Sequence, residues 1–248
     1  MAVFADIMVR LHGVNLWDGY AAPSPVGDVQ GWNGNHPALA RLALAPGARL
    51  DMAPGARLDM MPAARLDMAP GAPLDMARAS RVIIDVGVWK GQSTIAMAAS
   101  LRDAGVDGCV IAVDTFLGSA EHWGWTGLYK RHRGMPDLYA TFLTNVAAAG
   151  LQDYVVPLPQ TASGAAAILR RLGIVATLVH IDGDHAYAAV LQDAKDYWPI
   201  LAPGGHLVGD DYDPGWPGVV QAAREFASFA GQPLAIDAPK WIIQKPGA

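Results

Sequence analysis

Acidic residues follow two short apolar runs in the second half of the chain. The first run is followed by Asp182, Asp184 and His185, and the second by Asp210 and Asp211. Carboxylates that converge at one place repel each other unless a positive charge lies between them, and a hard divalent ion such as Mg²⁺ prefers oxygen ligands. This pattern predicts a magnesium site. Helix capping is the ordinary alternative, and Asp184 stands where it could cap a following helix.

A second group of residues surrounds a glycine-bearing turn. The run at 82–86 is apolar without alternation, which is typical of a central parallel strand covered on both faces. Gly87 and Gly91 follow it, and we expect them to let the backbone approach a ligand closely. A helix capped by Ser93 or Thr94 comes next. Because open α/β sheets bind small molecules at the carboxyl ends of their strands, this turn is predicted to bind a cofactor.

The acids near this turn indicate which cofactor it binds. Asp114 ends the next strand, 114 − 85 = 29 residues after Asp85, and a carboxylate there can accept hydrogen bonds from both hydroxyls of a ribose. A dinucleotide turn needs a second glycine where this chain has Trp89, and Asp85 repels phosphate. An acidic strand end suits a cationic nucleoside, and S-adenosylmethionine carries a sulfonium and an ammonium. An NAD-dependent reductase is the remote alternative.

Regular alternation of strands and helices from residue 81 onward must position these residues. The five runs before residue 210 are separated by helical segments, which predicts parallel strands. The last two runs are too close for a helical crossover, so they form an antiparallel hairpin. The sequence therefore predicts an α/β fold, a Rossmann-like, doubly wound, mostly parallel seven-stranded sheet with one reversed strand. The expected strands are 82–86, 109–113, 154–158, 176–181, 206–209, 234–236 and 241–244.

Four motifs resemble the class I S-adenosylmethionine-dependent methyltransferases. They are Asp85-Val-Gly-Val-Trp-Lys-Gly-Gln-Ser, Asp114-Thr-Phe-Leu-Gly-Ser, Asp182-Gly-Asp-His-Ala-Tyr and Pro203-Gly-Gly…Gly209-Asp-Asp-Tyr. More narrowly, residues 81 to 246 are similar to the branch of macrocin-type sugar O-methyltransferases and cephalosporin-hydroxylase-like proteins.

The resemblance implies a role for each motif. Methionine contacts fall on the first motif, ribose contacts on Asp114, and adenine contacts on the segment that begins at Gln160. It also implies Mg²⁺ ligands and a base, and the base is Asp184 or His185. The full expected set of cofactor contacts is Asp85, Gly87, Trp89, Gly91, Ser93, Asp114, Thr115, Gln160, Thr161 and Asp182, and the metal ligands are Asp182, Asp210 and Asp211.

The chain before residue 81 has a different character. We expect residues 1–44 to form an irregular N-terminal arm packed by its tryptophans, which could line a pocket or reach a second subunit. Residues 45–76 are four copies of an octapeptide related to Ala-Pro-Gly-Ala-Arg-Leu-Asp-Met, and we interpret them as a low-complexity insertion without chemistry. Residues 77–248 form the predicted methyltransferase domain.

Composition restricts the partners. The net charge of −5 argues against nucleic acid, and no stretch has the roughly 20 apolar residues that a membrane helix needs. The single cysteine, Cys109, suits a reducing compartment, so we expect a cytoplasmic protein. His180 and His206 lie inside strand patterns and are expected to be hydrogen-bonded core residues. His122, Trp123 and Trp125 are expected either to form a substrate wall or simply to pack.

Three functions are compatible with these residues. The first is a Mg²⁺-assisted O-methyltransferase acting on a hydroxyl of a small metabolite, with sugars and natural products as the leading options. The second is a metal-independent methyltransferase that uses His185 as its base. The third is a nucleoside-binding protein that has lost catalysis and serves in an assembly. Association into a homo-oligomer is left open by the sequence.

Overall fold

The structure, a computed structural model, describes residues 1–23, 27–45, 80–125 and 127–247. These residues form a seven-stranded sheet with the order β5-β2-β1-β6-β7-β9-β8. The octapeptide repeat lies outside the described residues except for Ala45. The strands of the sheet are β1 (Arg81–Val86), β2 (Gly108–Asp114), β5 (Val155–Pro159), β6 (Ala176–Ile181), β7 (Leu201–Gly209), β8 (Ala235–Asp237) and β9 (Lys240–Gln244).

The sheet is parallel except for β9, which pairs antiparallel with both β7 and β8. This confirms the predicted α/β fold with one reversed strand. One boundary is wrong: β7 begins at Leu201 rather than at the expected residue 206, and residues 203–205 form an irregularity inside the strand. Ala176 pairs with Leu201 there, whereas Leu178 pairs with His206.

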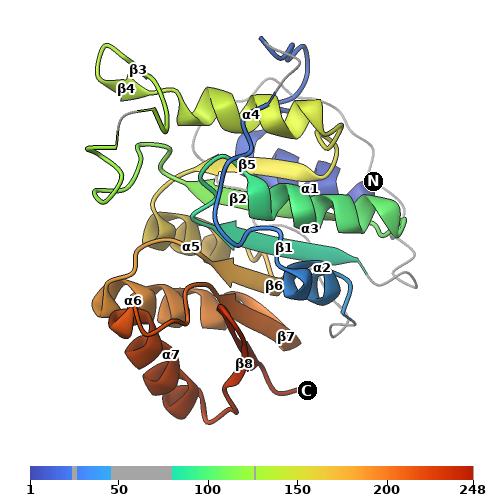
Figure 1. Ribbon diagram of the computed structural model, residues 1–248. Helices are drawn as coiled ribbons and strands as arrows, with labels where there is room; N and C mark the ends of the chain where they lie inside the picture. Colours follow the sequence, from blue (N-terminus) through green and yellow to red (C-terminus); the bar gives the residue numbers. More distant parts are fainter. Residues whose placement is uncertain (24–26, 46–79, 126, 248) are drawn as a thin grey trace.

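Helices cover the sheet in layers (Figure 1). On one side α5, α6 and α7 pack in succession, and elsewhere α2 packs on α3. A small hairpin of β3 (Arg131–His132) and β4 (Met135–Pro136) precedes α4. The helices are α1 (Ala2–His12), α2 (Pro37–Ala43), α3 (Gln92–Asp103), α4 (Leu138–Ala148), α5 (Ala162–Arg171), α6 (Tyr187–Tyr197) and α7 (Pro217–Ala230), with a 3₁₀ turn at Trp198–Ile200.

The prediction of an irregular N-terminal arm is wrong for two segments, because α1 and α2 are helices. Phe4, Ile7 and Met8 are buried in the core, since α1 packs against β2 and β5. Only Trp17 among the tryptophans of the arm is buried, and its indole N–H donates to the carbonyl of Val155 at 2.8 Å. The arm is therefore an integral part of the fold rather than a loose cover.

The carboxyl edge of the sheet has a switch point. From β1 the chain continues to β2 and β5 on one side, and then crosses to β6 and β7 on the other. Neighbouring helices therefore lie on opposite faces at this point, which leaves a crevice between the ends of β1 and β6. β1 and β6 are buried along their whole length, as their unbroken apolar sequences predicted.

Candidate active site

The turn after β1 is shaped by close contacts inside the protein. Gly87 has a φ of +83°, and a Cβ there would lie 1.9 Å from the carbonyl oxygen of Asp182. Gly91 has a φ of +93°, and its Cβ would meet the Phe142 ring at 2.9 Å. Each glycine thus admits a neighbouring part of the chain, and the expected approach of a ligand to their backbone stays a prediction. The contact at Gly87 joins the turn directly to the acidic end of β6.

Asp85 is fully buried and its carboxylate faces inward. It accepts hydrogen bonds from the hydroxyls of Ser93 at 2.8 Å and Thr94 at 2.5 Å, and its other oxygen lies 2.7 Å from Nδ1 of His180. Ser93 and Thr94 therefore do not cap α3, whose N-cap is Gly91. Asp85 fixes the start of α3, and the side chains of Asp85 and Ser93 are engaged with each other, so the ligand contacts expected of them stay a prediction.

Asp114 lies at the end of β2 beside the same turn. Its two carboxylate oxygens accept from the backbone N–H groups of Trp89 at 2.9 Å and Phe116 at 2.7 Å. Burial raises the pKa of Asp114, and the backbone hydrogen bonds act in the opposite direction. Each oxygen keeps a lone pair for a hydroxyl donor. Thr115 is exposed, and its hydroxyl accepts from the backbone of Leu117.

Gln160 and Thr161 follow β5, next to Asp114. The backbone N–H of Gln160 donates to the carbonyl of Asp114 at 2.9 Å, so the two strand ends lie side by side. Thr161 is the N-cap of α5 and accepts from the backbone of Gly164 at 3.1 Å. The structure thus brings the expected ribose and adenine residues to one edge, with the Thr161 side chain engaged in capping.

Residues 27–34 form a strap over the turn after β1, and sequence reasoning missed it. Lys90 is buried and pairs with Asp28 at 2.5 Å, while Gln30 accepts from the indole N–H of Trp89 at 3.3 Å. Asn145 of α4 donates to the backbone carbonyls of both Asp28 and Lys90 at 2.7 Å. The strap holds the turn in place and leaves Trp89, with a φ of +52°, half-buried beneath it.

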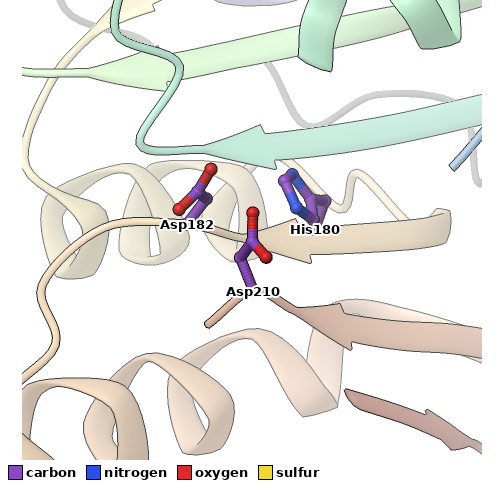
Figure 2. A group of neighbouring side chains, drawn as sticks. All are labelled: His180, Asp182 and Asp210. Atoms are coloured by element: carbon purple, nitrogen blue, oxygen red, sulfur yellow. The ribbon is translucent and has the colours of Figure 1, made fainter. Parts of the chain in front are cut away.

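The acids after β6 and β7 converge as predicted (Figure 2). Ligand atoms of His180, Asp182 and Asp210 all lie within 4.8 Å of one another, and so do those of Asp182, His185 and Asp211. Asp182 belongs to both groups, whereas the expected trio of Asp182, Asp210 and Asp211 is divided between them. A cavity of about 10 Å³ is lined by these acids and His185, which is about the space that one water molecule occupies.

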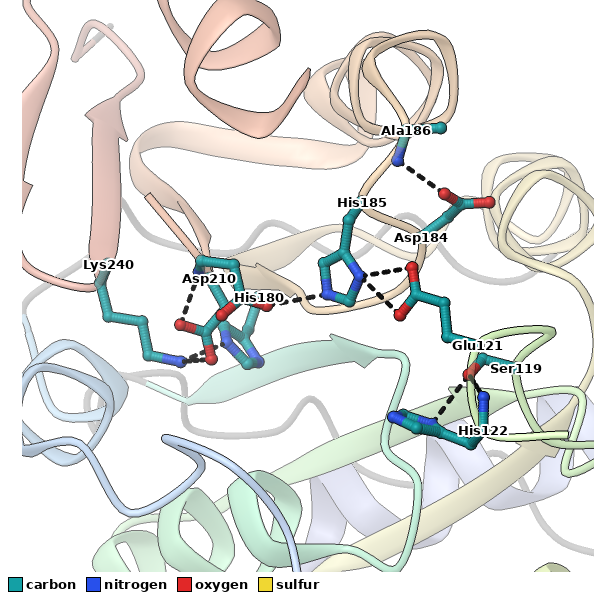
Figure 3. A network of polar contacts seen from close by, with 10 residues as sticks. Ser119, Glu121, His122, His180, Asp184, His185, Ala186, Asp210 and Lys240 are labelled. Atoms are coloured by element: carbon teal, nitrogen blue, oxygen red, sulfur yellow. Dashed lines mark hydrogen bonds and ion pairs between the residues drawn. The ribbon is translucent and has the colours of Figure 1, made fainter. Parts of the chain in front are cut away.

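Two cations of the chain itself neutralise part of this cluster (Figure 3). Lys240 of β9, which sequence reasoning missed, is fully buried and contacts Asp210 at 2.5 Å. His185 lies between two carboxylates, with Nε2 at 2.8 Å from Asp211 and Nδ1 at 3.1 Å from Glu121. The hydrogen bond to Asp211 raises the pKa of His185 to about 9, and the bond to Glu121 adds to this effect while burial opposes it. His185 is therefore an imidazolium at neutral pH.

Asp182 has no ion-pair partner among the described residues, and the nearby charge of Lys240 only partly offsets the effects that raise its pKa. Among the described residues, no side chain donates a hydrogen bond to its carboxylate. Burial raises the pKa of Asp182 well above its usual range, and the nearby charge of Asp210 raises it further. Asp182 is consequently the position in the cluster where a further positive charge is most stabilising.

Asp184 is turned away from this centre. Its carboxylate accepts from the backbone N–H of Ala186 at 2.7 Å and is exposed (Figure 3). The expected helix cap is wrong, because the N-cap of α6 is Ala186 and no side chain caps it; Asp184 instead stabilises the turn before the helix. Of the two residues proposed as the base, His185 is the one whose side chain contacts another member of the cluster.

Aromatic residues gather between the strap and the loop after β2. The ring of His122 stacks on Trp32 with centroids 4.9 Å apart, and Trp89 and Trp125 lie 5.1 Å and 4.9 Å from it. Trp123 packs instead against the guanidinium of Arg131. Of the predicted wall residues, His122 and Trp125 therefore share one cluster beside the turn, and Trp123 lies outside it.

The residues of the acid cluster fit a divalent cation in their chemistry. Three carboxylates with hard oxygen donors surround a small cavity, and in the described part of the chain no cationic side chain forms an ion pair with Asp182. One oxygen of Asp211 is bound to His185, which leaves the other for a ligand. Asp182, Asp210 and Asp211 are the residues that would hold the ion.

A ribose-binding acid beside a strand–turn–helix at the switch point is typical of α/β enzymes that use a nucleoside cofactor. The sequence pattern of the family described as "Methyltransferase domain" matches residues 84–212, more than half of the chain. The chain belongs to this family, and it is an S-adenosylmethionine-dependent methyltransferase. The class I resemblance seen in the four motifs is confirmed.

Two solved structures are similar to the chain to different degrees. The O-methyltransferase NovP is 23% identical with a TM-score of 0.51, over 67% of this chain and 72% of that one. The calicheamicin methyltransferase CalS11 is 19% identical with a TM-score of 0.45, over 66% of this chain and 72% of that one. At these identities the likeness concerns the fold alone. No curated protein matches the chain. Among the described residues, no helix is long and apolar enough to cross a membrane.

Proposed function

We propose that this methyltransferase transfers the methyl group of S-adenosylmethionine to a hydroxyl oxygen of a small metabolite, a sugar or sugar-bearing natural product, with the assistance of Mg²⁺. The observation that carries the proposal is the contact between Gly87 and the backbone of Asp182. It joins the turn predicted to hold the donor to the acids predicted to act on the acceptor.

Each residue of the proposed site has a distinct task. Asp114 accepts hydrogen bonds from the ribose hydroxyls of the donor. The strap holds the turn after β1 in the conformation that binds the donor. The donor supplies an electrophilic methyl group bonded to a sulfonium. Because the displacement requires the acceptor oxygen, methyl carbon and sulfur to be collinear, the rigid edge of the sheet contributes mainly by positioning.

The acid cluster is proposed to prepare the acceptor. A bound Mg²⁺ supplies Lewis acidity, which lowers the pKa of a hydroxyl group that it contacts. Asp182, Asp210 and Asp211 would hold it. His185 is the better positioned base, and it can take the hydroxyl proton only after losing its own. Because the pKa of His185 is about 9, this requirement favours alkaline pH.

The second candidate function is the same methyl transfer without a metal ion. Lys240 and His185 already pair with Asp210 and Asp211, which favours a metal-independent methyltransferase in which His185 is the base. In that case the charges of the chain replace the ion.

The test combines binding and turnover. Calorimetry with Mg²⁺ should show binding to the wild-type protein and none to an Asp182→Asn variant. Incubation with labelled S-adenosylmethionine and a panel of hydroxylated metabolites, sugars included, should give a methyl ether whose formation stops in EDTA. Formation unchanged in EDTA supports the metal-independent candidate, and products methylated only on nitrogen or sulfur contradict both.

A further inference from the structure

Four polar side chains, three in strands of the sheet and one directly after a strand, form a single buried row. The residues are Asp85 of β1, His180 of β6, Asp210 directly after β7 and Lys240 of β9, and none is more than 4% exposed. Lys240 Nζ lies 2.5 Å from Asp210 and 3.2 Å from Nε2 of His180, whose Nδ1 is 2.7 Å from Asp85. Figure 3 shows the part of the row between Lys240 and His180.

The hydrogen-bonding capacity of the groups fixes the direction of this row. An ammonium can only donate, so Nε2 of His180 must accept from Lys240. Nδ1 then carries the proton and donates to Asp85. Asp85 in turn accepts from Ser93 and Thr94 at the start of α3. One end of the row is therefore an acid of the cluster, and the other end is the helix that follows the donor turn.

The positions of Asp210 and Asp85, at the two ends of the row, depend on Lys240 and His180 between them. A buried charge or polar group that loses its partner is strongly destabilised, so each member is held by its neighbours. We propose that His180 and Lys240 are positioning residues that couple the acid cluster to the donor turn, so that a change at Asp210 alters the affinity for the donor. This rests on the proposed function, because it takes the donor to be bound by the turn after β1.

The affinity for S-adenosylhomocysteine, measured by calorimetry in EDTA, tests the coupling without turnover or metal. Asp210→Asn removes the charge that holds Lys240 and should weaken binding about 10-fold, a typical size for coupling between sites. Lys240→Met should weaken it similarly. The double variant should be no weaker than either single variant, because both changes break the same link.

His180→Asn separates the two halves of the row. The shorter amide can still donate to Asp85, but it cannot reach Lys240. Binding of S-adenosylhomocysteine should weaken about as much as in Lys240→Met, because the same link is broken, and adding Asp210→Asn should then change it no further. Because this variant keeps the Lys240–Asp210 pair, it also covers the case in which Lys240→Met does not fold.

Lys245→Met is the matched control. Among the described residues, the Lys245 ammonium donates to the backbone carbonyls of Trp198 and Leu201 and lies over the Trp198 ring, away from the row. Equal weakening by Lys245→Met and Lys240→Met would overturn the coupling, and so would wild-type affinity in an Asp210→Asn variant that has lost methyl transfer. The latter result leaves the proposed function intact. A wild-type protein that does not bind S-adenosylhomocysteine would instead overturn the proposed function.

Discussion

Two carboxylate–cation arrangements lie side by side at the carboxyl edge of the sheet, and they differ in their exposure to solvent. In the buried row, the side chains of Lys240 and Asp210 are 0% and 2% exposed. In the open trio of Glu121, His185 and Asp211, the side chains are 44%, 18% and 20% exposed. The ring of Trp216 stacks on His185 at 4.1 Å and covers only one face of it.

This difference in exposure indicates that the buried row has a structural role and that the open trio is the part that can react. Buried ion pairs have lost their hydration, so removing one partner is costly and the geometry is fixed. Exposed pairs exchange protein contacts for water at little cost. The buried row is therefore suited to hold Asp210, whereas the open trio can rearrange when an ion or an acceptor arrives.

The largest expected effect is the loss of protein stability when the buried pair is broken. Lys240→Ala leaves Asp210 buried without its cation and should lower the free energy of unfolding by about 3–5 kcal/mol, measured by urea denaturation. Replacing both partners, as Lys240→Met with Asp210→Leu, should recover most of that loss. A single-variant loss below about 1 kcal/mol would show that the pair is not the scaffold described here.

The next effect is a change at Asp182 that should lower activity while raising stability. Asp182→Asn should reduce methyl transfer about 100-fold or more, because the ligand most in need of a cation is lost. The raised pKa of Asp182 means that its ionised form destabilises the fold at neutral pH, so the same variant should melt at a higher temperature than wild type. A lower melting temperature together with full activity would contradict both roles.

A smaller effect is expected in the open trio. Glu121→Gln removes one exposed charge and should change the free energy of unfolding by less than about 1 kcal/mol. A loss as large as that of Lys240→Ala would remove the distinction between the two arrangements.

The smallest expected effect is a pH dependence of the contribution that His185 makes to protein stability. The folded-state pKa of His185 is raised to about 9 from an ordinary value of 6.5, so its contribution to stability is complete below pH 6.5 and is lost as the pH rises through 9. The difference in melting temperature between wild type and His185→Asn should shrink over that range. A difference that grows with pH would have the wrong sign.

The sequence predicted what depends on local pattern. Unbroken apolar runs located β1 and β6, and acids at strand ends located the cluster. The burial of Lys240 could not be predicted, because it depends on β9 lying beside β7, a pairing between residues far apart in the chain. Gly87 was correctly singled out, but its close neighbour is the carbonyl of Asp182, which only the three-dimensional arrangement reveals.

One missed element did have a local signal. Phe4, Ile7, Met8 and Leu11 stand at helical spacing, and they form the buried or half-buried side of α1. The turn formers that follow them drew the prediction of an irregular arm. The strap at 27–34 has no comparable signal, because its contacts with Trp89 and Lys90 join irregular segments.

A crystal structure of the protein with S-adenosylhomocysteine tests the account most directly. The account predicts ribose hydroxyls on Asp114 and the sulfur facing the cavity beside Asp182. A nucleoside bound elsewhere, for example in the groove between Tyr212 and Arg224, with Asp114 still bonded only to the backbone, would contradict it.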